Sequence, residues 1–144
     1  MSRRQARETA LQVLFAVDVG KIELDQAFNY VVEEFNTSLN ARQFARELLE
    51  GAIKYKDELD AIIARLSKGW EMKRLASVDR NIMRLALYEL IYRDDIPPAV
   101  SVNEAVEMAK LFGGEKSGKF VNGILGQVVE KLAEFKLDKE PFGT

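Results

Sequence analysis

The chain has 144 residues, of which 47% are hydrophobic, so it is long enough for one domain with a substantial core. It contains no cysteine and no histidine, which excludes disulfides, thiolate metal sites, thiol catalysis and histidine general bases. The formal net charge of −2 decides nothing about nucleic acid by itself, and because we find neither a signal peptide nor a membrane span we expect a cytoplasmic protein.

Apolar residues recur with helical spacing along the chain, and no stretch alternates with the period of a strand. The pattern predicts about seven helices, near residues 3–18, 24–35, 41–52, 56–66, 77–93, 101–112 and 115–135. We therefore expect one all-α domain, 1–144, in two packed helical subdomains of about 1–66 and 77–135. The tail, 136–144, is expected to be flexible.

Single residues suggest where some helices begin. Asn40 is a good N-cap for the third helix, and Gly51 either bends the junction between the third and fourth helices or weakens it. Two prolines then interrupt the chain before the sixth helix. Ser101 and Glu104 have the spacing of a capping box, in which the serine caps the helix and the glutamate bonds back.

The fifth predicted helix is apolar over most of its circumference, which is typical of a central helix. Its narrow polar arc, Arg80, Asn81 and Arg84, is expected to face solvent. Glu89 projects into the apolar side. This placement favours a hydrogen-bonded structural carboxylate over a functional one.

The segment GGEKSGKF, residues 113–120, follows a nucleotide phosphate-binding loop at its first seven positions, but Phe120 replaces the hydroxyl that would bind magnesium. A helix rather than a strand precedes it, and no strand ends in the second carboxylate, so we exclude an ATPase or GTPase. Lys116, Ser117 and Lys119 would stand near a helix start, where free amide groups favour an anion such as an RNA phosphate. A glycine turn with solvated lysines is the other interpretation, and spacing alone favours it.

Basic residues are concentrated at the amino terminus, in Arg3, Arg4 and Arg7, and again over 68–84. Such clusters can create a local positive potential in a protein of acidic total charge. With Phe15 further along as a stacking platform, the three arginines suit single-stranded RNA, which offers phosphates and unstacked bases. Two other interpretations remain open: Phe15 belongs to the core, and the arginines only add solubility.

Five motifs spread over most of the chain have a common family pattern: RRQARETALQVLF at the amino terminus, LALYEL (85–90), the IP step at 96–97, VNEAVEMAK (102–110) and SGKFVNGIL (117–125). In these motifs the chain strongly resembles the NusB family of bacterial transcription antitermination factors. The resemblance is weakest over 21–60 and after 130.

The resemblance implies an all-helical fold without catalytic activity, metal or cofactor. It also implies a factor that binds boxA, a short single-stranded RNA element found especially in ribosomal RNA operons. Binding would occur together with NusE, which is also a small-subunit ribosomal protein, within an RNA polymerase antitermination complex.

The resemblance also assigns residues by position. Matches to the RNA-binding arginine motif and to the loop beside it are Arg3, Arg4, Arg7, Ser117 and Lys119. Phe15 and Lys116 are candidates for further RNA contacts, and Asp79 is the candidate NusE contact. Gln5 interrupts the arginine run and Phe15 lacks a tyrosine hydroxyl, so we expect modest RNA affinity without NusE.

Two alternative functions remain. One is a helical protein-interaction scaffold that binds no RNA. The other is a detached NusB-like domain of a ribosomal RNA methyltransferase; a complete enzyme of that kind would need a further domain and a catalytic cysteine, which this chain lacks. The sequence leaves open whether the protein is a monomer or a homodimer.

Overall fold

The computed structural model describes residues 2–67 and 75–138 and contains no strand within them. The helices of these ranges are α1 (Ser2–Asp18), α2 (Leu24–Glu34), α3 (Leu39–Lys54), α4 (Lys56–Leu66), α5 (Ser77–Tyr92), α6 (Pro98–Gly113), α7 (Glu115–Glu130) and α8 (Leu132–Asp138). The predicted all-α fold is confirmed. In this part of the chain no helix is both long and apolar enough to cross a membrane.

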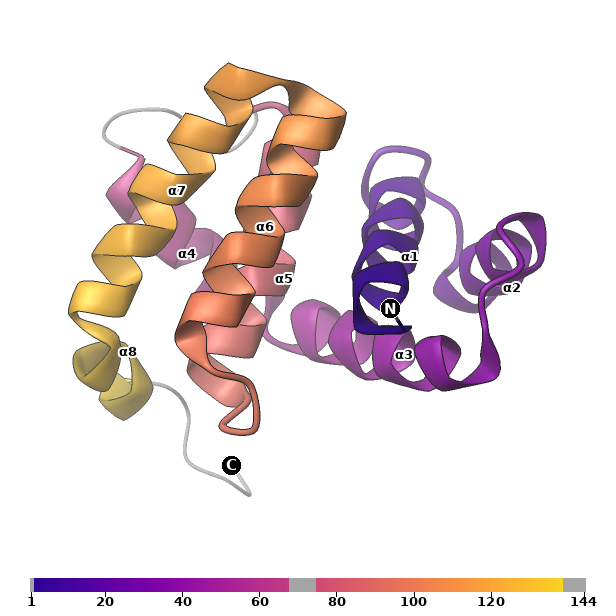
Figure 1. Ribbon diagram of the computed structural model, residues 1–144, viewed down its shortest axis with the longest axis horizontal. Coiled ribbons are helices and arrows are strands. Elements are labelled where there is room, and N and C mark those ends of the chain that lie inside the picture. The colour runs from indigo at the N-terminus through magenta and orange to yellow at the C-terminus, as the bar shows by residue number, and fades with distance from the viewer. Residues whose placement is uncertain (1, 68–74, 139–144) are drawn as a thin grey trace.

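Helix α5 is the centre of the packing, as its apolar circumference predicts. It contacts α1, α3, α4, α6, α7 and α8. Its Ile82, Leu87 and Ile91 are at most 1% exposed, and burial of each such side chain contributes about 1.5–3 kcal/mol. Figure 1 shows α1, α2 and α3 gathered on one side of the molecule and α4, α6, α7 and α8 on the other. Helix α4 contacts α5 and α7 as well as α3. The expected division into two subdomains near residue 66 stays a prediction.

The polar arc of α5 is buried, so the expectation that it faces solvent is wrong. Asn81 is 0% exposed and Arg84 4%. Asp18, at the end of α1, accepts hydrogen bonds from Arg80 at 2.7 Å and from Asn81 at 3.1 Å. Asp60 of α4 accepts from Arg84 at 2.6 Å and 2.9 Å. The arc is buried because neighbouring helices supply carboxylates that compensate its charge.

Two helices begin earlier than expected. Helix α3 follows Ser38, whose Oγ accepts a hydrogen bond from a first-turn amide, so Asn40 lies inside the helix. Helix α6 begins at Pro98, because proline lacks an amide hydrogen and suits the first helical position. Ser101 and Glu104 are therefore already helical, and both side chains bond to other helices. The predicted capping box is wrong.

The last predicted helix is two helices, with the break at Lys131. The turn lets α8 pack back on α5, with Phe135 buried beneath the guanidinium of Arg65, 5.0 Å from the ring centre. Residues 136–138 of the tail that we expect to be flexible complete α8, and residues 139–144 lie outside the described part of the chain, so the flexibility of the tail stays a prediction.

Gly51 lies inside α3, where its missing side chain makes room for an aromatic ring. A Cβ at this position would lie 2.1 Å from two ring atoms of Tyr88. Tyr88 in turn stacks with Tyr55 and with Tyr92, and those two rings are 3.9 Å apart. The glycine therefore fits a close approach between α3 and α5, and the chain turns into α4 only at Tyr55.

We expect Gly51→Ala to destabilise the protein. Overpacking costs about 1–3 kcal/mol, and the better helix propensity of alanine returns at most about 1 kcal/mol of this. Gly123→Ala in α7 is the matched control, because a Cβ there meets nothing within 4 Å and alanine should stabilise the helix. Urea denaturation measures both; a loss of stability at Gly123 or a gain at Gly51 would contradict the packing described.

Candidate nucleic-acid interface

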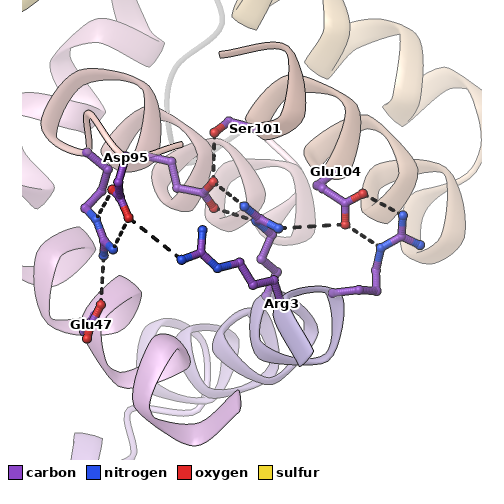
Figure 2. A network of polar contacts seen from close by, with 9 residues as sticks. Arg3, Glu47, Asp95, Ser101 and Glu104 are labelled. Carbon is purple, nitrogen blue, oxygen red and sulfur yellow. Dashed lines mark hydrogen bonds and ion pairs between the residues drawn. The ribbon is translucent and has the colours of Figure 1, made fainter. Parts of the chain in front are cut away.

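The three predicted RNA-binding arginines lie in the first two turns of α1, where this helix approaches α3, α5 and α6. Figure 2 shows the polar network that they form, with Arg3, Glu47, Asp95, Ser101 and Glu104 labelled. Each arginine has a carboxylate partner: Arg4 has one on α6, Arg7 has one on α5, and Arg3 has one in the segment that follows α5. The partners hold the three arginines to very different degrees.

Arg7 is buried and fully engaged. Its Nε and Nη2 donate to the two carboxylate oxygens of Glu89 at 2.9 Å and 2.8 Å, and the arginine is 3% exposed. Ser101 donates a third hydrogen bond to the same carboxylate, at 2.8 Å. This confirms the structural interpretation of Glu89. Arg7 is thus not displayed on the surface. The Nε–Nη2 edge of its guanidinium, at which a phosphate could bind, already holds Glu89.

Arg4 forms the same kind of pair at the surface. Its Nε and Nη2 donate to the two oxygens of Glu104 at 2.5 Å and 2.8 Å. The Arg4 side chain is nevertheless 45% exposed and that of Glu104 19%. The hydrogen bond from Arg4 lowers the pKa of the Glu104 carboxyl below its ordinary value, against the effect of burial. Glu104 is therefore ionised at neutral pH.

Arg3 is the least restrained of the three. Its guanidinium lies 4.3 Å above the ring centre of Phe44, and its Nη2 is 3.9 Å from Asp95, beyond hydrogen-bond distance. Asp95 is already held by Arg93, which donates to it at 2.9 Å and 3.0 Å and lowers its pKa. Because the Arg3 side chain is 52% exposed, its charge is open to an external anion.

The junction between α6 and α7, residues 113–119, displays the other predicted contacts, and all of it except Gly114 is helical. Gly114, with a φ of 93°, ends α6, and α7 then begins without a side-chain cap. Lys116 and Lys119 are exposed, and within the described ranges neither has a carboxylate at ion-pair distance. Ser117 donates to the carbonyl of Gly113 at 3.2 Å. The junction is thus a turn at Gly114 followed by the start of α7, which presents two lysines without a carboxylate at ion-pair distance among the described residues.

Asp79, the candidate NusE contact, lies in the first turn of α5, close to the junction between α6 and α7. It is 8% exposed, and its Oδ1 has no hydrogen-bond partner among the described residues. A Cβ placed on Gly113 would lie 2.3 Å from Ser117 Oγ and 3.5 Å from this oxygen. Burial raises the pKa of the Asp79 carboxyl, and a hydrogen bond with Ser117 offsets only part of that effect.

Phe15 lies apart from the arginines, roughly 16 Å beyond Arg4 along the axis of α1. It is 37% exposed and lines a largely apolar groove of about 660 Å³ between α1 and α2, together with Tyr30 and Phe35. The structure therefore does not bring this ring to the guanidinium groups. Phe44 contacts them instead, from α3.

The sequence missed the acidic half of this site. Glu104 fits a capping-box pattern in the sequence, and Asp95 lies in the segment with two prolines between the fifth and sixth predicted helices. Neither position suggested a partner for an arginine. Arg3 and Arg7 are four residues apart, so they lie on the same face of a helix. This spacing is a sequence signal that both contact the same neighbour, which is Phe44 in the structure. Within the described residues no group of three metal-ligating side chains is present.

Comparison with known proteins points to one family. The NusB family model matches residues 4–130. The transcription antitermination protein NusB of Desulforamulus reducens is 53% identical over 134 residues, which cover 93% of this chain and 94% of that relative. A solved structure of antitermination factors NusB and NusE in complex with dsRNA aligns with a TM-score of 0.83 and 34% identity, over 90% of this chain and 97% of that one. NusB of T. maritima aligns with a TM-score of 0.81 and 35% identity, over 96% and 93%.

We expect Glu89→Gln to destabilise the protein by about 3–5 kcal/mol, because it leaves the buried Arg7 guanidinium without its counter-charge. Glu104→Gln makes the same chemical change in a half-exposed pair and should cost about 1 kcal/mol or less. Urea denaturation of the two variants makes the comparison. Equal losses would contradict the difference in burial between the two pairs.

We expect Asp79→Asn to raise the melting temperature at pH 7 by about 3 °C. Burial disfavours the ionised carboxylate, and asparagine removes that charge, whereas the lost negative charge at the start of a helix costs only about 0.3–1 kcal/mol. The pKa of Asp79 is raised above 3.8, so its ionised form costs stability at pH values above the raised pKa, and the gain should shrink as the pH falls through it.

Calorimetry at pH 7 and pH 4 tests this, with Asp57→Asn as control, because Asp57 stands exposed in the first turn of α4. The control should lose a little stability at pH 7. A loss of similar size at Asp79 would show that its carboxylate is not strained by burial.

Proposed function

The chain belongs to the NusB family, and from this premise we propose that it is a transcription antitermination factor that binds boxA-type single-stranded RNA together with NusE. The relative from D. reducens carries the name transcription antitermination protein, and the aligned structure of NusB holds both NusE and an RNA. The proposal extends to a place in the RNA polymerase antitermination complex, mainly on ribosomal RNA operons. Because bacterial transcription takes place in the cytoplasm, the proposal includes a cytoplasmic location.

The proposed function is binding rather than catalysis. Glu89, the carboxylate that the sequence placed in an apolar setting, is held by Arg7 and Ser101, so its chemistry is that of a structural counter-ion. We propose no cofactor and no metal. The match over 94% of the D. reducens relative gives no support to a domain detached from a methyltransferase.

The observation that carries the RNA proposal is the set of exposed, weakly compensated cations on α1 and at the start of α7. Arg3 has no hydrogen-bonded carboxylate, and Lys116 and Lys119 have none at ion-pair distance among the described residues. The end of α6 lies nine residues beyond Glu104, roughly 13 Å along the helix axis. A short extended RNA strand that spans this distance can contact Arg3 and Arg4 at one end and the α7 residues Lys116, Ser117 and Lys119 at the other.

Arg7 and Asp79 have less direct roles in this proposal. Arg7 holds Glu89 from below and so fixes the part of α1 that displays Arg3 and Arg4. Asp79 supports the start of α7 through Ser117, and its buried Oδ1, which has no partner among the described residues, is the atom that a NusE donor would bind. Phe15 would contact RNA only if the strand extended to the α1–α2 groove.

A scaffold that binds protein and no RNA is the alternative. One observation favours it: the groove between α1 and α2 exposes Tyr30 by 65% and Phe35 by 55%, and α2 carries three acidic and no basic residues. Such a surface suits a protein partner better than a polyanion.

We expect Lys119→Ala to weaken binding of a labelled boxA-type RNA by about tenfold, equivalent to ~1.4 kcal/mol, because one charge-assisted phosphate contact is lost. The salt dependence of log K should fall by about 0.7. Fluorescence anisotropy across a salt series, with and without NusE, measures both quantities. Lys56→Ala, an exposed lysine at the start of α4, changes the net charge equally and should leave the affinity unchanged.

Arg3→Glu is the preferred charge reversal at α1, because Arg7→Glu would place a carboxylate against the buried Glu89 and unfold the site. The wild-type protein should bind more tightly with NusE than without it. No binding by a folded wild-type protein in either condition would favour the scaffold. Equal loss in the Lys119 and Lys56 variants would show a general charge effect instead of a phosphate contact at Lys119.

A further inference from the structure

Glu104 occupies one of the two edges of the Arg4 guanidinium at which an RNA phosphate can form a pair of hydrogen bonds. Both oxygens of its carboxylate accept hydrogen bonds from Arg4 Nε and Nη2, at 2.5 Å and 2.8 Å. A phosphate can bind arginine through the same pair of nitrogens, in the same plane and at similar distances. The carboxylate and a phosphate therefore compete for this edge, and the carboxylate also neutralises the charge that would attract the phosphate.

We propose that Glu104 is an intramolecular competitor of RNA, whose displacement from Arg4 accompanies binding and which thereby lowers the RNA affinity of the protein. The inference rests on the proposed RNA-binding function. It assigns to an acidic residue of α6 the control of how much of the arginine motif is available to RNA.

The position of the pair at the surface makes the exchange feasible. The Arg4 side chain is 45% exposed, so a phosphate can approach without unfolding of α1. Arg7 cannot respond in this way, because it is 3% exposed and bound to Glu89. Glu89 and Glu104 thus make the same bidentate contact, but only that of Glu104 lies within reach of a ligand.

Arg7 also offers a cation to the Glu104 carboxylate after RNA has displaced it from Arg4. Its Nη1 lies 4.0 Å from Glu104 Oε1, so a carboxylate that leaves Arg4 still has a cation beside it. A charge left 19% exposed without such a partner would oppose its own displacement. The buried Arg7–Glu89 pair therefore supplies a fixed second position for the displaced carboxylate.

The other acidic residues near the arginines do not share this property. Asp95 is 3.9 Å from Arg3 and is already held by Arg93 at 2.9 Å, so it does not occupy Arg3. The hydrogen bond with Glu104 is the main cause of the raised pKa of Arg4, and Glu8 and Glu107 add to it only through their charge. Glu104 is thus distinguished by contact.

The test is RNA affinity measured by anisotropy for the wild type, Glu104→Gln, Arg4→Ala and the double variant, with boxA-type RNA in the presence of NusE. Glu107→Gln is the matched control, because it removes one exposed carboxylate from the same face of α6, three residues away. We expect Glu104→Gln to tighten binding by about five- to tenfold and Glu107→Gln by less than about twofold. In the Arg4→Ala background, Glu104→Gln should have no further effect.

Each other outcome overturns the inference. Weaker binding by Glu104→Gln would show that the carboxylate orients Arg4 for RNA. Equal tightening in both glutamine variants, or tightening that persists without Arg4, would show a general charge effect. If Lys119→Ala weakens binding while Glu104→Gln changes nothing, the inference fails and the proposed function stands. If no folded variant binds RNA, the proposed function fails, and the inference with it.

Discussion

The buried ion pair between Arg7 and Glu89 is the contact on which the arrangement of this surface depends. It joins α1 to the central helix α5, and Ser101 of α6 completes it. Two charges taken out of water recover little net stability from their attraction, so the pair is better understood as a device of geometry. It sets how α1 lies on α5 and α6, and through that it sets what the neighbouring arginines meet.

Three arginines within five residues thus have three different chemical situations. The difference comes from position on one helix: Arg7 faces the core, Arg4 lies at the boundary with α6, and Arg3 stacks on Phe44 at the edge. A helix advances 100° per residue, so adjacent arginines cannot share an environment. An arginine-rich motif is therefore a mixture of structural and exposed charges.

The same distinction applies to the basic segment at 68–84. Arg80 and Arg84 contribute to its positive charge in sequence, but Asp18 and Asp60 compensate them inside the protein. Lys68, Lys73 and Arg74 lie outside the described residues. The exposed lysines at the start of α7, with no carboxylate at ion-pair distance in the described chain, contribute more to a surface potential than their number suggests.

Periodicity and apolar surroundings are local properties of the chain, so the sequence alone predicts the all-α fold, the central place of α5 and the structural character of Glu89, although not every helix boundary. It also carried the family motifs. Tertiary contacts were needed to show that Arg3 is the least restrained arginine, that Glu104 binds Arg4 instead of capping α6, and that Arg84 is buried and Arg80 half-buried. Those outcomes depend on carboxylates from helices up to 100 residues away in the chain, and no local pattern records which side chains will meet.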